Sequence, residues 1–387
     1  MQLERALRDA EARGAEPHPF ASHLLVHLKE VLPYPRSAAA APAARLLAGW
    51  PAGSSHLVHM AGHLFMRIGD YHGVVDSNLA AVRADRRQEA ACLSPYVASG
   101  HARVPNSPLT LRNPRRYVPG HNEGMLALGA MYSGQFDLAL REAGAFPLHG
   151  EPRAAMAPGA WAQDLHFVHP PPRAVVLARA GRWGDLEREP LDLPAGSPAF
   201  NRVVALYAAG LLAAARRDPD RAAARLGELR LAAAEVPEAA LPAGHHFHPR
   251  HREVAALFAD VLAARVALLD GDFAAAVAEL EEAVAKYDAL PYMEPEHFYL
   301  PVRTCLGAVL LARGDRDAAR ARYEEDLAEH PENGWSLRGL LRLAHAEAGT
   351  GGGTVAARAA DLEGRFRRAW AKADSPIKGS CCEFGLC

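Results

Sequence analysis

The sequence has little of what nucleic-acid-binding or membrane-spanning proteins need. Its 387 residues carry 43 Lys and Arg against 45 Asp and Glu, so no strong positive field would attract nucleic acid. No apolar run approaches the roughly 20 residues that cross a bilayer. The charged N-terminal stretch lacks the apolar segment of a signal peptide. These absences predict a soluble, cytoplasmic protein that binds neither nucleic acid nor a membrane.

Aromatic residues are also scarce, at 7% of the chain, and Val and Ile are far outnumbered by Ala and Leu. Half of the residues are apolar, which is enough to bury a large interior. Ala and Leu favour helices, whereas β-branched and aromatic residues favour strands. The composition therefore predicts an all-α protein.

One pattern recurs along the chain: an apolar stretch, a turn built on Gly with a polar or aromatic residue, and a second stretch with alanines at fixed offsets. It is found as IGDYHGVVDSNLAAV from Ile68, SGQFDLAL from Ser133, AGRWGDL from Ala180, DGDFAAAVAELEEAV from Asp270 and RGDRDAARARYEEDLAEHP from Arg313. Each copy predicts one helical hairpin. A hairpin cannot bury its apolar face alone, so neighbouring hairpins would stack and share a core.

These copies resemble the tetratricopeptide repeat (TPR), in which a small residue lies midway along the first helix, an aromatic follows the turn, and alanines allow close helix approach. The matching residues are Gly62, Tyr71, Ala81, Phe273, Ala276, Ala283, Gly307, Ala319, Tyr323 and Pro331. Segments such as HLVHMAGHLFMRIGDYHG and PENGWSLRGL further resemble a bacterial group of long TPR proteins. The resemblance implies a fold, but it brings no activity with it.

The expected architecture is a right-handed α-solenoid of about seven TPR-like hairpins over residues 1–375. Residues 88–120 are rich in Pro, Gly and Ser and are expected to form a long loop that could close over the groove. Residues 349–354, GTGGGT, are expected to be a flexible joint before a last amphipathic helix that ends near Asp374. Residues 376–387 are expected to be a flexible tail.

Three histidines of one predicted helix share a face. His56, His59 and His63 are spaced by three and four residues, so they fall within about 60° of one another on a helix. The TPR resemblance places them at positions that line the concave, ligand-binding groove. His23 and His27 precede His59 and His63 by 36 residues each, so the preceding repeat carries a copy of the row.

The row extends downstream as well. The turn at Gly134 sets the register of a third repeat and puts His121 in its groove, beside Asn122 and Glu123. The predicted metal ligands are therefore His23, His27, His56, His59, His63 and His121. Arg67, Asn122 and Glu123 are predicted to bind other ligands of the groove.

A row of imidazoles favours a transition metal as cofactor, because neutral imidazole is a common ligand of copper, zinc and iron. Six imidazoles with few carboxylates favour copper, in one mononuclear site or in a pair of three-histidine sites. Iron would usually need a carboxylate, for which Glu123 and Glu30 are candidates. A structural zinc site would be closed by four ligands, whereas an open groove would leave a position for substrate.

Five cysteines form two groups. Cys92 and Cys305 are isolated and are expected to be reduced. Cys381, Cys382 and Cys387 fall in the last seven residues, where thiolates could hold Cu(I) or zinc or take part in redox chemistry. The tail could deliver metal, enter a groove of this chain or of a neighbour, or be a plain terminus.

The leading functional hypothesis is a copper-dependent oxidoreductase that acts on a peptide or small molecule in the histidine-lined groove. One alternative is a non-catalytic TPR adaptor that binds an extended peptide there. The other is a metal store or chaperone, in which groove histidines and tail cysteines exchange an ion without turnover.

Overall fold

The computed structural model describes residues 2–15, 18–51, 53–98, 120–143, 172–194, 196–237, 250–348 and 353–386. These residues form seventeen α-helices and two short 3-10 helices, and no β-strand occurs among them. The all-α prediction is therefore confirmed. The chain divides into two compact units, described separately below: one holds the residues up to Ala130 with 329–331, and the other holds most of the remainder.

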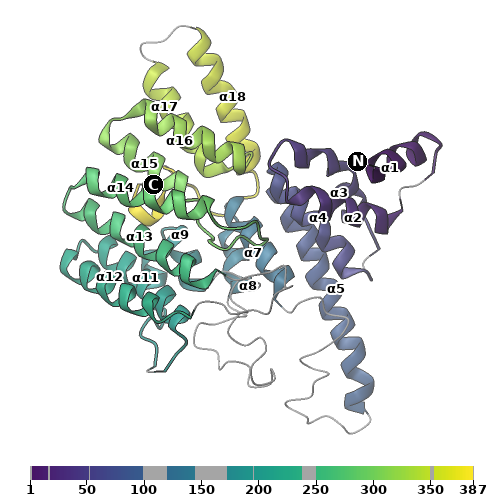
Figure 1. Ribbon diagram of the computed structural model, residues 1–387, viewed down its shortest axis with the longest axis horizontal. Coiled ribbons are helices and arrows are strands. Elements are labelled where there is room, and N and C mark those ends of the chain that lie inside the picture. Colours follow the sequence, from purple (N-terminus) through teal and green to yellow (C-terminus); the bar gives the residue numbers. More distant parts are fainter. Residues whose placement is uncertain are drawn as a thin grey trace. The chain divides into compact units, whose positions relative to one another are not determined.

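The first unit is built from five helices and the start of a sixth (Figure 1). They are α1 (Gln2–Ala12), α2 (Pro19–Glu30), α3 (Ala41–Ala48), α4 (Ser55–Ile68), α5 (Tyr71–Ala98) and α7 (His121–Tyr132), with the 3-10 helix η1 (Arg36–Ala40) before α3. Successive helices pack together: α2 lies against α3 and α4, and α4 lies against α5.

The second unit continues the pattern of paired helices (Figure 1). Its helices are α8 (Phe136–Ala143), α9 (Arg173–Arg179), α10 (Trp183–Leu186), α11 (Ala199–Ala215), α12 (Pro219–Ala234), α13 (His251–Leu269), α14 (Phe273–Asp288), α15 (Val302–Arg313), α16 (Arg316–Glu329), α17 (Gly334–Ala348) and α18 (Gly353–Ala369), followed by the 3-10 helix η3 (Cys382–Phe384). The pairs α11–α12, α13–α14 and α17–α18 pack closely, and α13 and α15 join consecutive pairs. Adjacent packing of this kind is consistent with an α-solenoid.

The recurrent Gly-Asp turns have a physical reason. Gly69 ends α4 in the left-handed conformation at φ 78°, which an L side chain rarely adopts. The aspartate that follows such a glycine then accepts a hydrogen bond from a backbone N–H of the next helix, as Asp70 does from Gly73 (2.9 Å). Asp272 caps α14 in the same way, by accepting from the backbone of Ala275.

Small residues let the paired helices approach closely. A Cβ on Gly62 of α4 would lie 2.4 Å from Asn78 Nδ2 on α5, and one on Gly307 of α15 would lie 2.6 Å from the Tyr323 ring on α16. Ala81 is fully buried in α5. Close approach of paired helices is the role that the TPR resemblance implies for the small residues. Membership of the TPR family and the right-handed twist stay predictions.

Two of the expected interruptions are shorter than the sequence suggested. The prediction of a loop from residue 88 is wrong for residues 88–98, because α5 continues to Ala98 through the helix-forming run Gln88–Leu93. Gly353 and Thr354 belong to α18 rather than to a joint, and α18 ends at Ala369. Residues 99–119 and 349–352 lie outside the described residues, so the rest of both predictions is untested.

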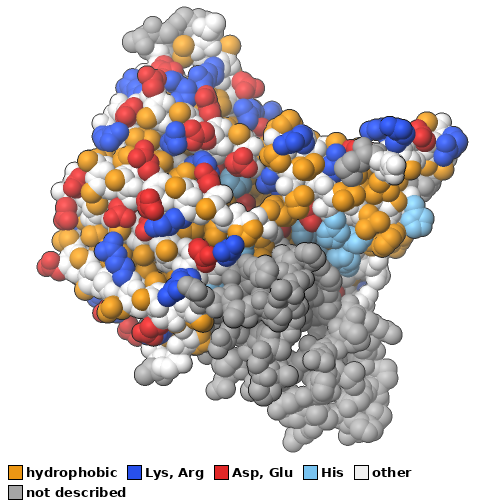
Figure 2. Space-filling model, viewed as in Figure 1, with side chains coloured by type: hydrophobic (Ala, Val, Ile, Leu, Met, Phe, Trp, Pro, Cys, Tyr) orange, Lys and Arg blue, Asp and Glu red, His pale blue; other side chains and the backbone are white. Residues whose placement is uncertain are grey.

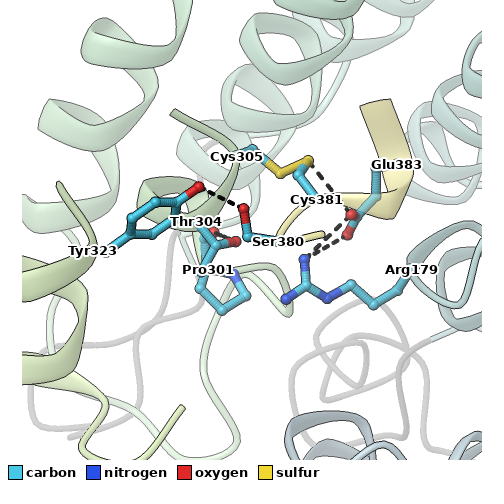
Figure 3. The surroundings of a disulfide bond; sticks show 8 residues. All are labelled: Arg179, Pro301, Thr304, Cys305, Tyr323, Ser380, Cys381 and Glu383. Atoms are coloured by element: carbon cyan, nitrogen blue, oxygen red, sulfur yellow. Dashed lines mark hydrogen bonds and ion pairs between the residues drawn. A yellow bond between two sulfur atoms is a disulfide. The ribbon is translucent and has the colours of Figure 1, made fainter. Parts of the chain in front are cut away.

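The prediction of a mobile tail is also wrong for residues 376–386. Cys381 is fully buried and forms a disulfide with Cys305 of α15, so Cys305 is not reduced either (Figure 3). The Ser380 hydroxyl lies 2.6 Å from the Tyr323 hydroxyl. The tail cannot build a core of its own, but it is buried against helices that already have one.

An ion pair joins the same segment to α9. The Arg179 guanidinium donates to both oxygens of Glu383, at 2.9 and 3.2 Å, and both side chains are buried (Figure 3). Arg179 also stacks on the Trp335 ring, 3.8 Å from its centroid. Burial raises the pKa of Glu383 above its ordinary value, although Arg179 opposes this shift.

The buried disulfide changes two predictions about the cysteines. Cys305, Cys381 and Glu383 lie close enough to hold an ion, but the two sulfurs are bonded to each other and Cys382 is disulfide-bonded as well. The tail therefore offers no thiolate from Cys381 or Cys382 in this state, and Cys387 lies outside the described residues. Cytoplasmic proteins usually keep their cysteines reduced. The disulfide therefore gives no support to a cytoplasmic location, which stays a prediction.

Among the described residues, no helix combines the length and the apolarity needed to cross a membrane.

Candidate metal centre

Six histidines from three helices of the first unit lie together. α2 supplies His23 and His27, α4 supplies His56, His59 and His63, and α7 supplies His121. Figure 2 shows a patch of histidine side chains on this unit, in the region where Figure 1 labels α2 and α4. They form two groups of three, defined here as the inner trio (His59, His63, His121) and the outer trio (His23, His27, His56).

The inner trio is buried, and its ring nitrogens converge. His59 Nε2 lies 2.8 Å from His63 Nε2 and 3.0 Å from His121 Nε2. Two nitrogens bound to one tetrahedral ion at about 2.0–2.1 Å would lie about 3.3 Å apart. A shift of a few tenths of an ångström would thus give these two pairs the spacing of ligands on one ion, and the ligand atoms of all three histidines lie within 4.8 Å of one another. The expectation of an open groove is wrong here, because all three side chains are buried.

Asn78 of α5 sets the orientation of His59. Asn78 Nδ2 donates to the backbone oxygen of Val74 (2.9 Å), so its Oδ1 faces His59 Nδ1 at 2.8 Å. An amide oxygen can only accept, and the hydrogen of His59 is therefore on Nδ1. Gly62 allows this contact, because a Cβ there would occupy the space of the Asn78 amide. The lone pair of His59 then lies on Nε2, toward the other two imidazoles.

Glu30, the last residue of α2, sets the orientation of His63. Glu30 Oε2 lies 2.8 Å from His63 Nδ1. A nitrogen this close to a carboxylate oxygen carries a hydrogen, since two lone pairs would repel each other. In a neutral His63 ring, the lone pair would then also be on Nε2.

With His63 neutral, two acceptor nitrogens face each other at 2.8 Å, His59 Nε2 and His63 Nε2, with His121 Nε2 beside them. Such an arrangement is electrostatically unfavourable unless a cation lies between the nitrogens. A metal ion between them would use both lone pairs, and also that of His121 when the hydrogen of His121 is on Nδ1. The inner trio can accordingly hold a metal ion.

The outer trio lies nearer the surface and is half-buried. His23 Nε2 lies 3.1 Å from His56 Nε2, and the rings of His23 and His27 meet edge to face with centroids 4.7 Å apart. His27 Nδ1 donates to Glu30 Oε1 at 2.8 Å, which leaves its lone pair on Nε2. The outer trio can also hold an ion, at a place that solvent reaches.

The environment keeps four of the six imidazoles neutral. Burial, followed by the neighbouring histidines, lowers the pKa of His121 to about 3 and that of His59 well below 6.5. The same causes lower the pKa of His56 to about 4, and burial also lowers the pKa of His23. Neutral imidazole is the form that binds metal, so these four rings are in a binding-competent state at neutral pH.

Glu30 is ionised in the same environment. Burial raises its pKa, but the contacts with His63 and His27 outweigh burial and hold the pKa at about 2. A carboxylate that accepts the second ring N–H of a metal-binding histidine fixes the tautomer and makes the other nitrogen a better donor to metal. Glu30 does this for His27 of the outer trio, and its other oxygen lies 2.8 Å from His63 Nδ1 of the inner trio.

The three other predicted ligand-binding residues are engaged elsewhere or are buried. Asn122 donates to the Asp85 carboxylate (2.7 Å) and to the Ser55 hydroxyl (3.2 Å). Arg67 donates to the backbone oxygen of Leu32. Glu123 is buried in α7. Asn122 thus joins α7 to α4 and α5, and Arg67 joins α4 to the segment that follows α2.

Sequence reasoning missed Asn78 and understated Glu30. Asn78 lies on the second helix of the hairpin, 19 residues after His59, where no spacing rule connects the two. Glu30 was named only as a possible iron ligand, although its position three residues after His27 places it on the same helical face.

No protein-family model and no curated protein matches this chain.

Proposed function

We propose that the six-histidine cluster binds a transition metal, with copper favoured, and that the protein is an oxidoreductase acting on a peptide or small molecule bound beside it. The observation that carries the proposal is the 2.8 Å approach of His59 Nε2 and His63 Nε2, with each Nδ1 directed at a fixed acceptor. With both rings neutral, these two nitrogens are acceptors, and a metal ion between them would make the approach favourable.

The donor set favours copper over iron or zinc. Six imidazoles suit Cu(I) and Cu(II), and copper stands highest in the general affinity order of divalent ions. The non-haem iron sites of oxygenases usually include a carboxylate ligand, whereas the Glu30 oxygens lie 2.8 Å from ring nitrogens of His27 and His63. Zinc remains compatible with a three-histidine site that keeps one open position.

Oxidation chemistry is supported by the different exposure of the two trios. The inner trio is shielded from water, which would protect a reduced ion there. The outer trio is half-exposed, so a substrate or O2 could reach an ion that it holds. The net reaction would take two electrons and two protons from the substrate and give them to O2, forming hydrogen peroxide.

The test is the elemental content of protein purified without an affinity tag, compared with a variant that carries His59→Ala and His63→Ala. We expect copper in the native protein and its loss in the variant. His345→Ala, at an exposed histidine of α17, is the matched control and should keep the metal. Equal metal content in the double variant and the native protein would contradict the proposal.

Turnover is a separate measurement. Copper-loaded protein should consume O2 in the presence of a candidate substrate and release hydrogen peroxide. Protein that binds copper tightly but never consumes O2 would instead be a metal store or chaperone.

A peptide-binding adaptor is the second candidate, and an exposed apolar stripe supports it. Phe20, Leu24 and Leu28 recur every four residues on α2 and are exposed, followed by exposed Val31 and Tyr34. Such a stripe could bind the apolar side chains of a peptide. An adaptor would bind peptide equally well with and without a chelator, whereas the metal-dependent protein would not.

A further inference from the structure

The six histidines divide into two groups rather than forming one. Within the inner trio, ring centroids lie 4.6–5.6 Å apart, and within the outer trio the His23 ring lies 4.7 Å from that of His27 and 5.0 Å from that of His56. Between the trios, the ring centroids are 6.1 Å apart for His56–His59 and 6.3 Å apart for His27–His63. Each trio brings its own nitrogens within reach of one ion, so a single ion would leave one trio unused.

Glu30 connects the two trios through opposite oxygens. Its Oε1 accepts from His27 Nδ1 of the outer trio, and its Oε2 lies against His63 Nδ1 of the inner trio, both at 2.8 Å. The side chain is buried, so water does not compete strongly for either oxygen. One carboxylate thereby directs the Nε2 lone pair of a histidine in each trio away from itself.

The charge of Glu30 also matters. Two neighbouring cations held only by neutral imidazoles repel each other, and the repulsion is strong where water is excluded. An ionised carboxylate between them reduces this repulsion without occupying a coordination position.

We propose that the cluster binds two metal ions, one in each trio, and that Glu30 is the positioning residue shared by both sites. This inference rests on the proposed metal binding. It bears on the chemistry because one copper ion passes one electron at a time between Cu(I) and Cu(II). Two adjacent ions can pass the two electrons that a substrate gives up and that O2 needs to become hydrogen peroxide.

The experiment is an anaerobic titration of metal-free full-length protein with Cu(I), against a chromophoric competitor that reports free copper. We expect two equivalents for the native protein. The pair His59→Ala with His121→Ala should leave one equivalent, and so should the pair His23→Ala with His56→Ala. One equivalent in the native protein would overturn the two-site inference while leaving metal binding intact, and no binding at all would overturn both.

The role of Glu30 is tested in the same titration. Glu30→Gln should weaken both sites, by about 10- to 100-fold as expected for a residue that orients metal-binding histidines. Glu4→Gln, on α1 and paired with Lys29, is the control and should bind two equivalents with native affinity. If Glu30→Gln kept native affinity at both sites, or weakened one alone, Glu30 would not be shared.

A spectroscopic readout separates positioning from mere stability. After oxidation to Cu(II), two neighbouring ions in the native protein should give an electron paramagnetic resonance signal that integrates to less than the copper present. Glu30→Asp keeps the charge on a shorter side chain and should retain two equivalents with an altered signal. A native signal that accounts for every copper ion would contradict adjacent sites.

Discussion

A hydrogen-bonded amide fixes the tautomer of the most buried histidine. Asn78 places its oxygen on His59 Nδ1 because its nitrogen is held by the Val74 carbonyl. Without this hydrogen bond, the hydrogen of His59 could be on Nε2, the nitrogen that faces His63 and His121. Asn78 does not contact Nε2, the nitrogen that would bind metal. It nevertheless decides that Nε2 carries the lone pair of His59.

Asn78→Ala should lower both stability and metal affinity. Removing the Asn78 oxygen takes away the acceptor of the buried His59 Nδ1–H, which costs about 1–3 kcal/mol in the free energy of unfolding. Copper affinity should fall about tenfold. Urea denaturation and copper titration measure the two effects. Arg83→Ala, at an exposed residue of the same helix, should change the free energy of unfolding by less than about 0.5 kcal/mol.

Acidification should destabilise the metal-free protein. The pKa of His121 is about 3 and that of His59 is well below 6.5 in the folded state, whereas both are near 6.5 in the unfolded chain. The unfolded chain therefore takes up protons first as the pH falls below 6.5. The stability that these histidines give is fully present above pH 6.5 and is lost progressively toward the folded pKa values.

From pH 8 to pH 5, the free energy of unfolding should fall by about 2 kcal/mol for each such histidine. Urea denaturation in the presence of a chelator measures this loss. His121→Asn removes one of the titrating groups, so its stability should fall less steeply over the same range. A variant with the native slope would show that His121 does not titrate as described.

At the scale of elements, the position of α5 against α4 depends on a missing side chain. Gly62 leaves room for the Asn78 amide, and a Cβ there would lie 2.4 Å from Asn78 Nδ2. The helix–helix approach and the orientation of His59 are therefore consequences of one glycine.

Gly62→Ala should destabilise the protein even though alanine favours a helix. The intrinsic gain is about 1 kcal/mol, but displacing Asn78 in a packed interface costs about 1–3 kcal/mol and also disturbs His59. Thermal unfolding and copper titration should both register the change. Gly227→Ala in α12 is the control: nothing lies within 4 Å of its Cβ, so it should stabilise by up to about 1 kcal/mol.

At the scale of the whole molecule, a covalent bond holds the C-terminal segment in the second unit. The Cys305–Cys381 disulfide closes a loop across a sequence separation of 76 residues. A cross-link of this span restricts the unfolded chain strongly. The buried Arg179–Glu383 pair joins the same segment to α9.

Cys381→Ser should lower the free energy of unfolding of the second unit by about 2–5 kcal/mol. Denaturation followed by tryptophan fluorescence, which includes the buried Trp335, measures the loss. Copper binding by the first unit should persist, because all six histidines lie outside this region. Native stability in the variant, or copper binding lost together with the disulfide, would contradict the description.

The sequence by itself determined the features that depend on local periodicity. Helical spacing places His56, His59 and His63 on one face, and Gly-Asp turns mark where helices end and begin, because both follow from the geometry of a few consecutive residues. The all-α class and the grouping of the six histidines were accessible for this reason.

The tertiary structure alone decided the rest. The division into two trios, the bonds of Asn78 and Glu30, and the burial of His59 depend on how α2, α4, α5 and α7 meet. The pairing of Cys305 with Cys381 likewise joins residues 76 positions apart. The composition of residues 376–387 predicted a flexible tail and gave no sign of this bond. Spacing rules describe one helix at a time, whereas these contacts form between elements, where packing decides which side chains meet.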